Sequence, residues 1–190
     1  MAFFPMMVST ENQNVIVIGG GEEGLKKIRI LRSFGALITL VAPDALPEAI
    51  QLSNVFHKKK FSSEDLEVQD YMLVVSATND REVNSLVSSL AKAKRIPVNV
   101  VDDTELCTFI FPAIIKENDL VCAVSSAGKS PYVAQYVKGL IQECLPPQIG
   151  MINDQMGEYR ESVKNEISDV VKRREALKNK LDSLIEDLNH

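Results

Sequence analysis

The glycine-rich stretch at residues 19–24, GGGEEG, has the spacing of a turn that binds the diphosphate of a dinucleotide. It follows a continuous apolar run at residues 15–18 and opens a helical pattern. In such a strand–turn–helix unit, Gly19 permits the tight turn, Gly21 leaves room for the diphosphate, and Gly24 allows the helix to pack closely on the strand. The helix start, at Glu22, offers backbone N–H groups and a partial positive charge to the phosphates. The alternative is a merely tight glycine turn, and the context favours a dinucleotide.

The second expected strand departs from the usual dinucleotide-binding pattern. An acidic residue normally ends this strand and binds the ribose hydroxyls. Here the strand ends Val41-Ala42-Pro43, and Asp44 follows slightly late, so either Asp44 or backbone groups would hold the ribose. No arginine follows that would accept a 2′-phosphate, which favours NAD over NADP.

A carboxylate ends the strand expected at residues 97–101. Asp102 closes the stretch Asn99-Val100-Val101-Asp102. Because ligands of doubly wound sheets bind at the carboxyl ends of the strands, Asp102 could accept a proton or orient a ligand there. The alternative is that Asp102 and Asp103 only cap the following turn, and Asp103 fits that structural role better.

The loop SSAGKSP at residues 125–131 is a second candidate site, suited to carboxylates. Its hydroxyls, small residues and lysine precede a helix start, where Ser130 is a good N-cap and Pro131 a good first residue. The helix terminus adds a partial positive charge. A well-capped helix start explains the same pattern, and both interpretations can hold together. The candidate binding residues of this loop are Ser125, Ser126, Gly128 and Lys129.

Alternating strands and helices must position these groups. Short apolar runs alternate with helical patterns over residues 14–111, which predicts an α/β fold, a Rossmann-like doubly wound and mostly parallel sheet. We therefore expect a first domain at residues 1–112. The expected strands are 15–18, 37–42, 54–56, 71–76 and 97–101, and the expected helices are 25–32 and 80–94.

From residue 112 the pattern changes to a small αβ region and then to helices. A strand at 120–125 and a helix at 131–145 precede Pro146 and Pro147, which mark a boundary between regions 113–147 and 148–190. Arg174 interrupts a helical seam at a position where an apolar residue would fit. The seam predicts one long helix or two packed together, with its stripe covered by a neighbouring domain or a second subunit. Its apolar residues are Val163, Ile167, Val170, Leu177, Leu181, Leu184 and Leu188.

Composition excludes several classes of protein. The net charge of −5 points to neither nucleic acid nor an anionic membrane, and no apolar run reaches the roughly 18 residues of a spanning helix. Three cysteines without CxxC spacing argue against disulfides and structural zinc, and the apolar start does not have the pattern of a signal peptide. We therefore expect a cytoplasmic protein.

The two histidines, His57 and the terminal His190, are too few to assemble a histidine metal site or a catalytic triad. The basic run after His57 is typical of a solvated edge strand.

Three stretches resemble the precorrin-2 dehydrogenase family, which includes the N-terminal part of sirohaem synthases. They are FFPMMVSTENQNVIVIGGGEEGLKKIRILRSFGALITLVAP, SATNDREVN and IPVNVVDDTELCTFIFPAIIKENDLVCAVSSAGKSP, and their order and spacing match over residues 3–145. The resemblance implies a homodimer built from a Rossmann domain, a dimerisation region and a helical C-terminal region. It also implies a substrate cavity near the nicotinamide, shared between these parts.

The same resemblance implies NAD-dependent oxidation of precorrin-2, a reduced tetrapyrrole with eight carboxylates, to sirohydrochlorin in sirohaem biosynthesis. The family's acid in the NVVD motif corresponds to Asp102, and its substrate-binding serine corresponds to Ser126. The segment Thr78-Asn79-Asp80 matches one that approaches the cofactor, although Asn79 or Asp80 could simply cap the next helix.

Three alternatives remain open. Some members of the family also insert iron; Asp102 could remove pyrrole protons, but nothing else in the sequence suggests a metal site, so dehydrogenation is favoured. A nucleotide-sensing Rossmann module, of the kind that regulates potassium transport, would share the glycine turn and a segment like SATNDREVN, although such modules usually carry an acid at the end of the second strand. The last alternative is an NAD-dependent dehydrogenase of another small substrate.

Overall fold

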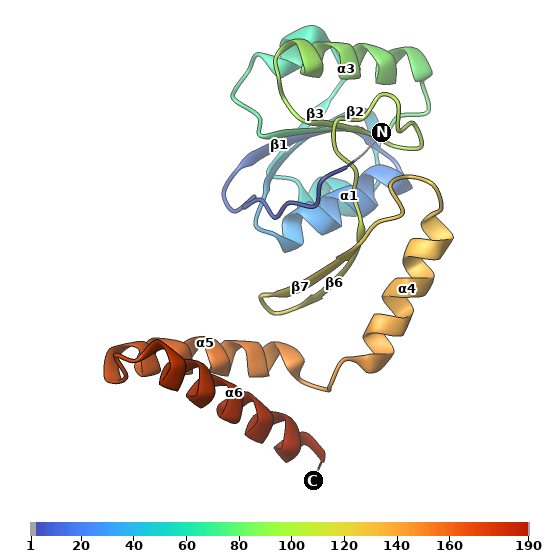
Figure 1. Ribbon diagram of the computed structural model, residues 1–190. Coiled ribbons are helices and arrows are strands. Elements are labelled where there is room, and N and C mark those ends of the chain that lie inside the picture. Colours follow the sequence, from blue (N-terminus) through green and yellow to red (C-terminus); the bar gives the residue numbers. More distant parts are fainter. Residues whose placement is uncertain (1–2, 190) are drawn as a thin grey trace. The chain divides into compact units, whose positions relative to one another are not determined.

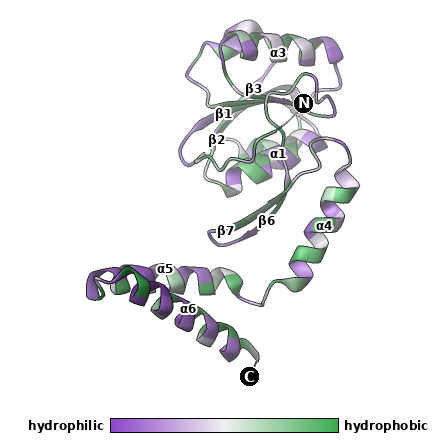
Figure 2. Cartoon of the chain, viewed as in Figure 1, coloured by the Kyte–Doolittle hydropathy of each residue, from purple (hydrophilic) through white to green (hydrophobic). Residues whose placement is uncertain are grey.

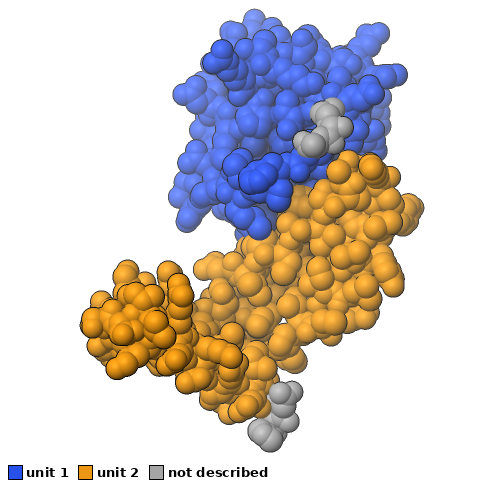
Figure 3. Space-filling model, in the orientation of Figure 1, with its two compact units in different colours: residues 1–111 blue, residues 112–190 orange. Residues whose placement is uncertain are grey.

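The computed structural model describes residues 3–189. The contacts within the chain form two compact units, which divide between residues 111 and 112 (Figure 3). The expected first domain, residues 1–112, differs from the first unit by one residue. The finer division of the second unit, at residue 147, stays a prediction.

The first unit is a five-stranded parallel sheet with helices on both faces, which confirms the predicted Rossmann-like fold (Figure 1). The strand order β3-β2-β1-β4-β5 changes direction between β1 and β4, where doubly wound folds bind their ligands. The strands are β1 (Asn14–Gly20), β2 (Leu37–Ala45), β3 (Val55–Lys58), β4 (Leu73–Ser76) and β5 (Val98–Val100). The helices are α1 (Glu22–Ser33), α2 (Pro47–Leu52) and α3 (Arg81–Ala93), with a 3-10 turn at Ser63–Leu66.

Alternating side chains of β1 explain why its apolar run is continuous. Val15 and Val17 pack in the cluster that includes Ile28 of α1, whereas Ile16 and Ile18 pack in the cluster that includes Val87 of α3. Successive residues of a strand point to opposite faces, so a strand covered on both faces is apolar throughout. Figure 1 shows α1 and α3 on opposite sides of the sheet. This packing fixes the start of α1 at the end of β1.

The second strand is longer than expected. It continues through Pro43 to Ala45, where Ala45 pairs with Gly20 of β1. Its pairing with β3 ends at Ala42, so the exposed Pro43 lies where no hydrogen bond to β3 is needed. Helix α2, which periodicity did not predict, begins directly afterwards with Pro47 as its first residue.

The second unit contains an antiparallel hairpin and three helices. The predicted strand at 120–125 and helix at 131–145 correspond to β7 (Leu120–Val124) and α4 (Pro131–Cys144). Strand β6 (Ala113–Glu117) was not predicted and pairs with β7 across a turn at Asn118-Asp119, where Asn118 has φ 53°. Asparagine tolerates this positive φ. The pair Asn118-Asp119 between two apolar runs was the sequence signal that could have indicated a hairpin.

The predicted seam is divided between two packed helices, α5 (Ile149–Glu166) and α6 (Val170–Glu186). Asp169 is the N-cap of α6, and its Oδ1 accepts hydrogen bonds from two backbone N–H groups. Val163 is buried, but Val170 and Leu181 are 51% and 39% exposed, so the second unit covers the stripe only in part. No helix of the described chain is long and apolar enough to cross a membrane. His190 lies outside the described residues.

Candidate functional site

The glycine turn connects β1 to α1 and is packed against the end of β4. A Cβ on Gly19, whose φ is +104°, would lie 2.3 Å from the carbonyl oxygen of Ala77, and a Cβ on Gly24 would lie 2.1 Å from the carbonyl oxygen of Gly19. Both positions therefore require glycine. A Cβ on Gly21 would meet nothing within 4 Å. The turn thus has two glycines that close it and one that faces open space.

Helix α1 begins without a side-chain cap. Its N-cap is Gly21, so no side chain accepts a hydrogen bond from the N–H groups of the first turn. Glu22, the first helical residue, is exposed, and its backbone N–H belongs to that first turn. Glu23 is paired with Lys26 at 2.6 Å. The open face at Gly21 and the uncapped N–H groups fit a diphosphate, as the sequence pattern predicts.

Asp44 lies beside this turn in the extension of β2. Its carbonyl oxygen would be 3.0 Å from a Cβ on Gly20, and Leu46 N–H donates to the Gly20 carbonyl at 2.9 Å. Asp44 is exposed. The extra length of β2 therefore brings an acidic residue next to the turn, although the sequence places it later than the usual ribose-binding acid.

A buried amide organises the end of β4. Asn84 of α3 accepts hydrogen bonds from Ser76 Oγ at 2.7 Å and Thr78 Oγ1 at 2.8 Å, and its Nδ2 donates to the Thr78 carbonyl at 3.0 Å. Sequence reasoning did not single out Asn84, although an amide on the apolar face of α3 was the available signal. This network fixes Thr78 beside the glycine turn, because Ala77 contacts Gly19.

The other two candidates of this segment differ in their contacts. Asp80 caps α3: its Oδ1 accepts from Glu82 N at 3.0 Å and from Val83 N at 3.2 Å. That is the structural alternative considered from the sequence. Asn79 is exposed, and its side chain makes no hydrogen bond within the described chain. Of the two, Asn79 is the one whose side chain is free to bind a ligand.

Asp102 is the second residue after β5, on the same sheet edge. Val101 N–H donates to the Ser76 carbonyl at 2.9 Å, which joins the ends of β5 and β4. Asp102 is exposed, has φ +61°, and its side chain has no hydrogen-bond partner among residues 3–189. Asp103 instead accepts from Glu105 N at 3.2 Å and so caps the turn. Of the two carboxylates, only that of Asp102 has no hydrogen-bond partner in the described chain.

A buried thiol holds the Asp102 loop against β5. Cys107 Sγ lies 3.1 Å from Val100 N, which donates to it, and 3.2 Å from the carbonyl oxygens of Val100 and Asp103. Burial raises the pKa of the Cys107 thiol above its ordinary value of 9.0. The protonated thiol therefore stabilises the folded loop.

We expect the stability advantage of Cys107 over serine to shrink in alkaline solution. Below pH 9.0 the thiol is protonated in both the folded and the unfolded chain. Above it the unfolded thiol ionises first, so the free energy of unfolding falls as the pH rises towards the raised pKa. Urea denaturation of wild type and Cys107→Ser at pH 7 and pH 10, with reductant, measures this difference. Cys144→Ser, at an exposed thiol, is the control. A wild-type advantage that is equal at both pH values would contradict the prediction.

A half-buried lysine lies near the same loop. Lys27 of α1 has its Nζ 4.7 Å from the ring centre of Phe111, and no carboxylate of the described chain lies within 4 Å of it. Burial lowers the pKa of Lys27, while Glu23 and Asp102 act in the opposite direction. Lys27 therefore puts a positive charge in the electrostatic environment of Asp102. Nothing in the sequence distinguishes this lysine from the neighbouring Lys26.

The second candidate site belongs to the second unit and forms a cluster of its own. Ser126 Oγ accepts from Ser130 N at 3.0 Å, and Ser125 Oγ accepts from Ala127 N at 3.1 Å. Gly128 has φ +79° and is exposed, as is Lys129. Ser130 caps α4 through Val133 N at 3.3 Å, as predicted. The loop is thus internally braced, with the ammonium group of Lys129 at its surface.

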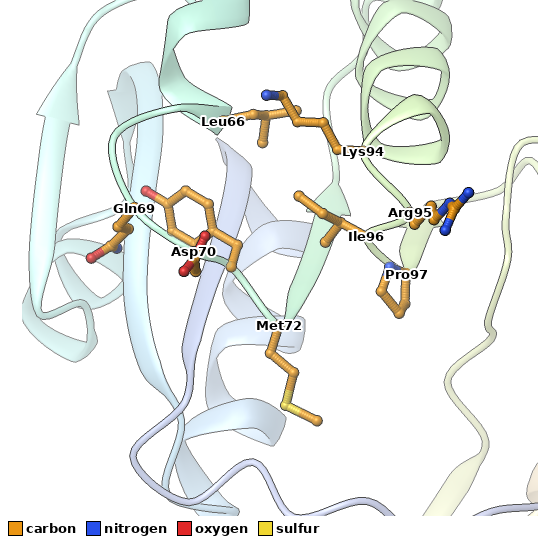
Figure 4. A pocket seen from close by; sticks show the side chains of 9 residues that line it. Leu66, Gln69, Asp70, Met72, Lys94, Arg95, Ile96 and Pro97 are labelled. Carbon is orange, nitrogen blue, oxygen red and sulfur yellow. The ribbon is translucent and has the colours of Figure 1, made fainter.

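A hollow of about 480 Å³ lies at the opposite edge of the first unit's sheet (Figure 4). Met72 and Pro97 line it just before β4 and β5 begin, so it is at the amino ends of the strands. Lys94, Asp70 and Gln69 also line it. The glycine turn and Asp102 follow the carboxyl ends of strands, and the hollow therefore does not belong to the candidate site.

Several known proteins are similar to this chain in sequence or in fold. Residues 6–113 match the family NAD_binding_7, described as "Putative NAD(P)-binding". Siroheme synthase of Tolumonas auensis is 36% identical over 176 residues, and that of Ectopseudomonas mendocina is 38% identical over 176 residues. Both alignments cover 92% of this chain but only 37% and 38% of those proteins, so the chain spans less than two fifths of their length. These similarities confirm the resemblance noted from the motifs.

One solved structure, titled "SirC, precorrin-2 dehydrogenase", matches nearly the whole chain. It has a TM-score of 0.77 at 22% identity and covers 98% of this chain and 99% of its own. This match supports the fold of both units.

Proposed function

Because the chain belongs to the NAD(P)-binding family matched over residues 6–113, we propose that it is an NAD-dependent dehydrogenase that oxidises precorrin-2 to sirohydrochlorin. The observation that carries this proposal is the free carboxylate of Asp102, on the sheet edge that also bears the open glycine turn. Similarity to siroheme synthases and to a precorrin-2 dehydrogenase supplies the substrate. We also propose that it works in the cytoplasm.

The first unit would hold the cofactor. Gly19, Gly21 and Gly24 shape the turn, and the backbone N–H of Glu22 lies in the uncapped first turn of α1 that would bind the diphosphate. Asp44 is proposed to bind the ribose hydroxyls. Since an acid at this position repels a 2′-phosphate, we propose NAD rather than NADP. Thr78 and Asn79 would border the nicotinamide side, with Asp80 fixing the start of α3.

Asp102 is proposed to act as the base or as the orienting carboxylate. The bound nicotinamide supplies the hydride acceptor. As the substrate loses a hydride, a proton must also leave the ring, and an Asp102 Oδ atom without a hydrogen-bond partner in the described chain can accept it. The half-buried Lys27 is a cation close enough to interact electrostatically with this carboxylate.

The loop of the second unit would bind substrate carboxylates. The exposed Lys129 supplies a positive charge, and the turn at Gly128 leaves backbone groups accessible. The hydroxyl protons of Ser125 and Ser126 remain free to donate, because both oxygens act as acceptors in their backbone contacts. These four residues suit a polyacidic ligand.

A homodimer is proposed from an uncovered face of α4. Tyr132, Tyr136 and Leu140 recur every four residues and are 86%, 68% and 44% exposed. Figure 2 shows hydrophobic segments of this helix alternating with more hydrophilic ones. Apolar residues at this spacing form one stripe, and an exposed stripe of this kind marks an interaction surface.

We expect Tyr136→Arg to halve the molar mass of the protein in solution, because an arginine in the centre of the stripe would be buried without a partner. Light scattering coupled to size-exclusion chromatography measures the mass. Lys138→Glu, on the same helix, is the charge-changing control and should leave the mass unchanged. A Tyr136→Arg protein that keeps the wild-type mass would argue against this interface.

Anaerobic incubation with precorrin-2 and NAD tests the proposed activity. Simultaneous appearance of sirohydrochlorin and NADH absorbance is the expected result. NAD binding without turnover would instead favour the nucleotide-sensing module. Oxidation of other small alcohols, but not of precorrin-2, would indicate a dehydrogenase with a different substrate.

A further inference from the structure

A groove between α5 and α6 is lined by apolar and positively charged residues only. Its volume is about 360 Å³, which is in the range of small-molecule sites. Val163, Val170 and Leu177 supply apolar surface. The remaining lining residues are all basic: Arg160, Lys164, Arg173 and Arg174.

The positive charges of this basic groove are largely uncompensated. Among the described residues, no carboxylate lies within 4 Å of Arg160, Arg173 or Arg174, and Lys164 pairs only with Glu161 at 3.7 Å. Residues 170–181 contain five basic residues and one acidic residue, a net charge of +4 in a chain whose net charge is −5. The groove therefore concentrates positive charge locally, and guanidinium groups bind carboxylates with two parallel hydrogen bonds.

Arg174 is the residue that interrupts the predicted helical seam. An apolar residue at this position would extend the surface formed by Val170 and Leu177, yet the structure has an exposed arginine at the groove. Val170 is itself 51% exposed. An uncovered apolar surface bordered by unpaired guanidinium groups is suited to a ligand that is both apolar and acidic.

We propose that the basic groove binds the carboxylate-bearing edge of a tetrapyrrole. The choice of tetrapyrrole rests on the proposed function; the preference for an apolar polycarboxylate rests on the groove itself. A macrocycle edge would place methylene groups against the apolar residues of the groove and carboxylates at its arginines. A nucleic acid would require an extended basic surface, which does not suit a groove of this size in an acidic chain.

Uroporphyrin I, a stable octacarboxylate porphyrin, is the probe. Fluorescence titration of the full chain should show that Arg173→Gln with Arg174→Gln weakens binding by about tenfold or more, because two charge-assisted contacts are lost. The control is Lys172→Gln with Lys178→Gln, which removes the same charge from α6 at exposed positions that do not line the groove. The control should bind as the wild type does. Circular dichroism should show equal helix content in all three proteins.

Two outcomes would overturn the proposal. One is unchanged uroporphyrin binding by the double arginine variant; the other is equal weakening in both double variants, which would show only a general charge effect. Lys129→Gln reports separately on porphyrin bound at the loop of residues 125–130. If the wild type binds uroporphyrin through the arginines but does not oxidise precorrin-2, the proposed function fails and the groove stands. If it turns over precorrin-2 while the double arginine variant binds normally, only the groove fails.

Discussion

Asp102→Asn is expected to lower kcat for precorrin-2 oxidation by about 100-fold or more, while NAD affinity stays within about twofold of the wild type. The reason is that asparagine keeps the size of the side chain but cannot accept a proton. The backbone of residue 102 has φ +61°, a conformation that asparagine tolerates as well as aspartate does. The fold should therefore be preserved, whereas alanine would add backbone strain and confuse the result.

Initial rates of NADH formation and a separate NAD titration measure the two effects. Asp103→Asn is the matched control, because Asp103 lies next in the chain but accepts a hydrogen bond from Glu105 N at 3.2 Å. It should lower the free energy of unfolding slightly and leave kcat near the wild-type value. Turnover by Asp102→Asn close to that of the wild type would remove Asp102 from the chemistry.

The sheet and its principal helices were predictable because their signals are local and periodic. The run at residues 15–18 is apolar throughout because both faces of β1 are covered, and the glycine spacing directly after it indicates the turn. Asp102 could be placed on the ligand-binding edge for the same reason, since it directly follows a predicted parallel strand.

The features that could not be predicted depend on tertiary contacts. The extension of β2 beyond Pro43 exists because Ala45 pairs with Gly20, and a proline ordinarily ends a strand. The hydrogen bonds of Asn84 join residues from β4 and α3, and no spacing rule shows that its side chain turns inward. The groove at Arg174 also depends on tertiary contacts. Periodicity indicates only that an arginine interrupts the seam, whereas the packing of α5 and α6 shows the groove that Arg174 lines.

Gly21→Asp is expected to weaken NAD binding by about 100-fold or more, through the bulk and the negative charge placed beside the diphosphate. Gly21 is the position where this test is cleanest. A Cβ there meets nothing within 4 Å, and its φ of −79° and ψ of −169° are open to any residue. By contrast, a Cβ on Gly24 would lie 2.1 Å from the Gly19 carbonyl, so Gly24→Ala would distort the turn itself.

Aspartate is also a favourable N-cap, and Gly21 is the N-cap of α1. The substitution should therefore keep or raise the thermal midpoint of unfolding, because the new carboxylate accepts hydrogen bonds from the same N–H groups that would otherwise bind phosphate. Calorimetric titration with NAD and a thermal melt separate the two effects, and Gly21→Ala tests bulk without charge. An unchanged NAD affinity in the aspartate variant would mean that the diphosphate binds elsewhere. Lost affinity together with an undiminished midpoint would show that the diphosphate binds beside residue 21 at the start of α1, since the fold itself would be intact.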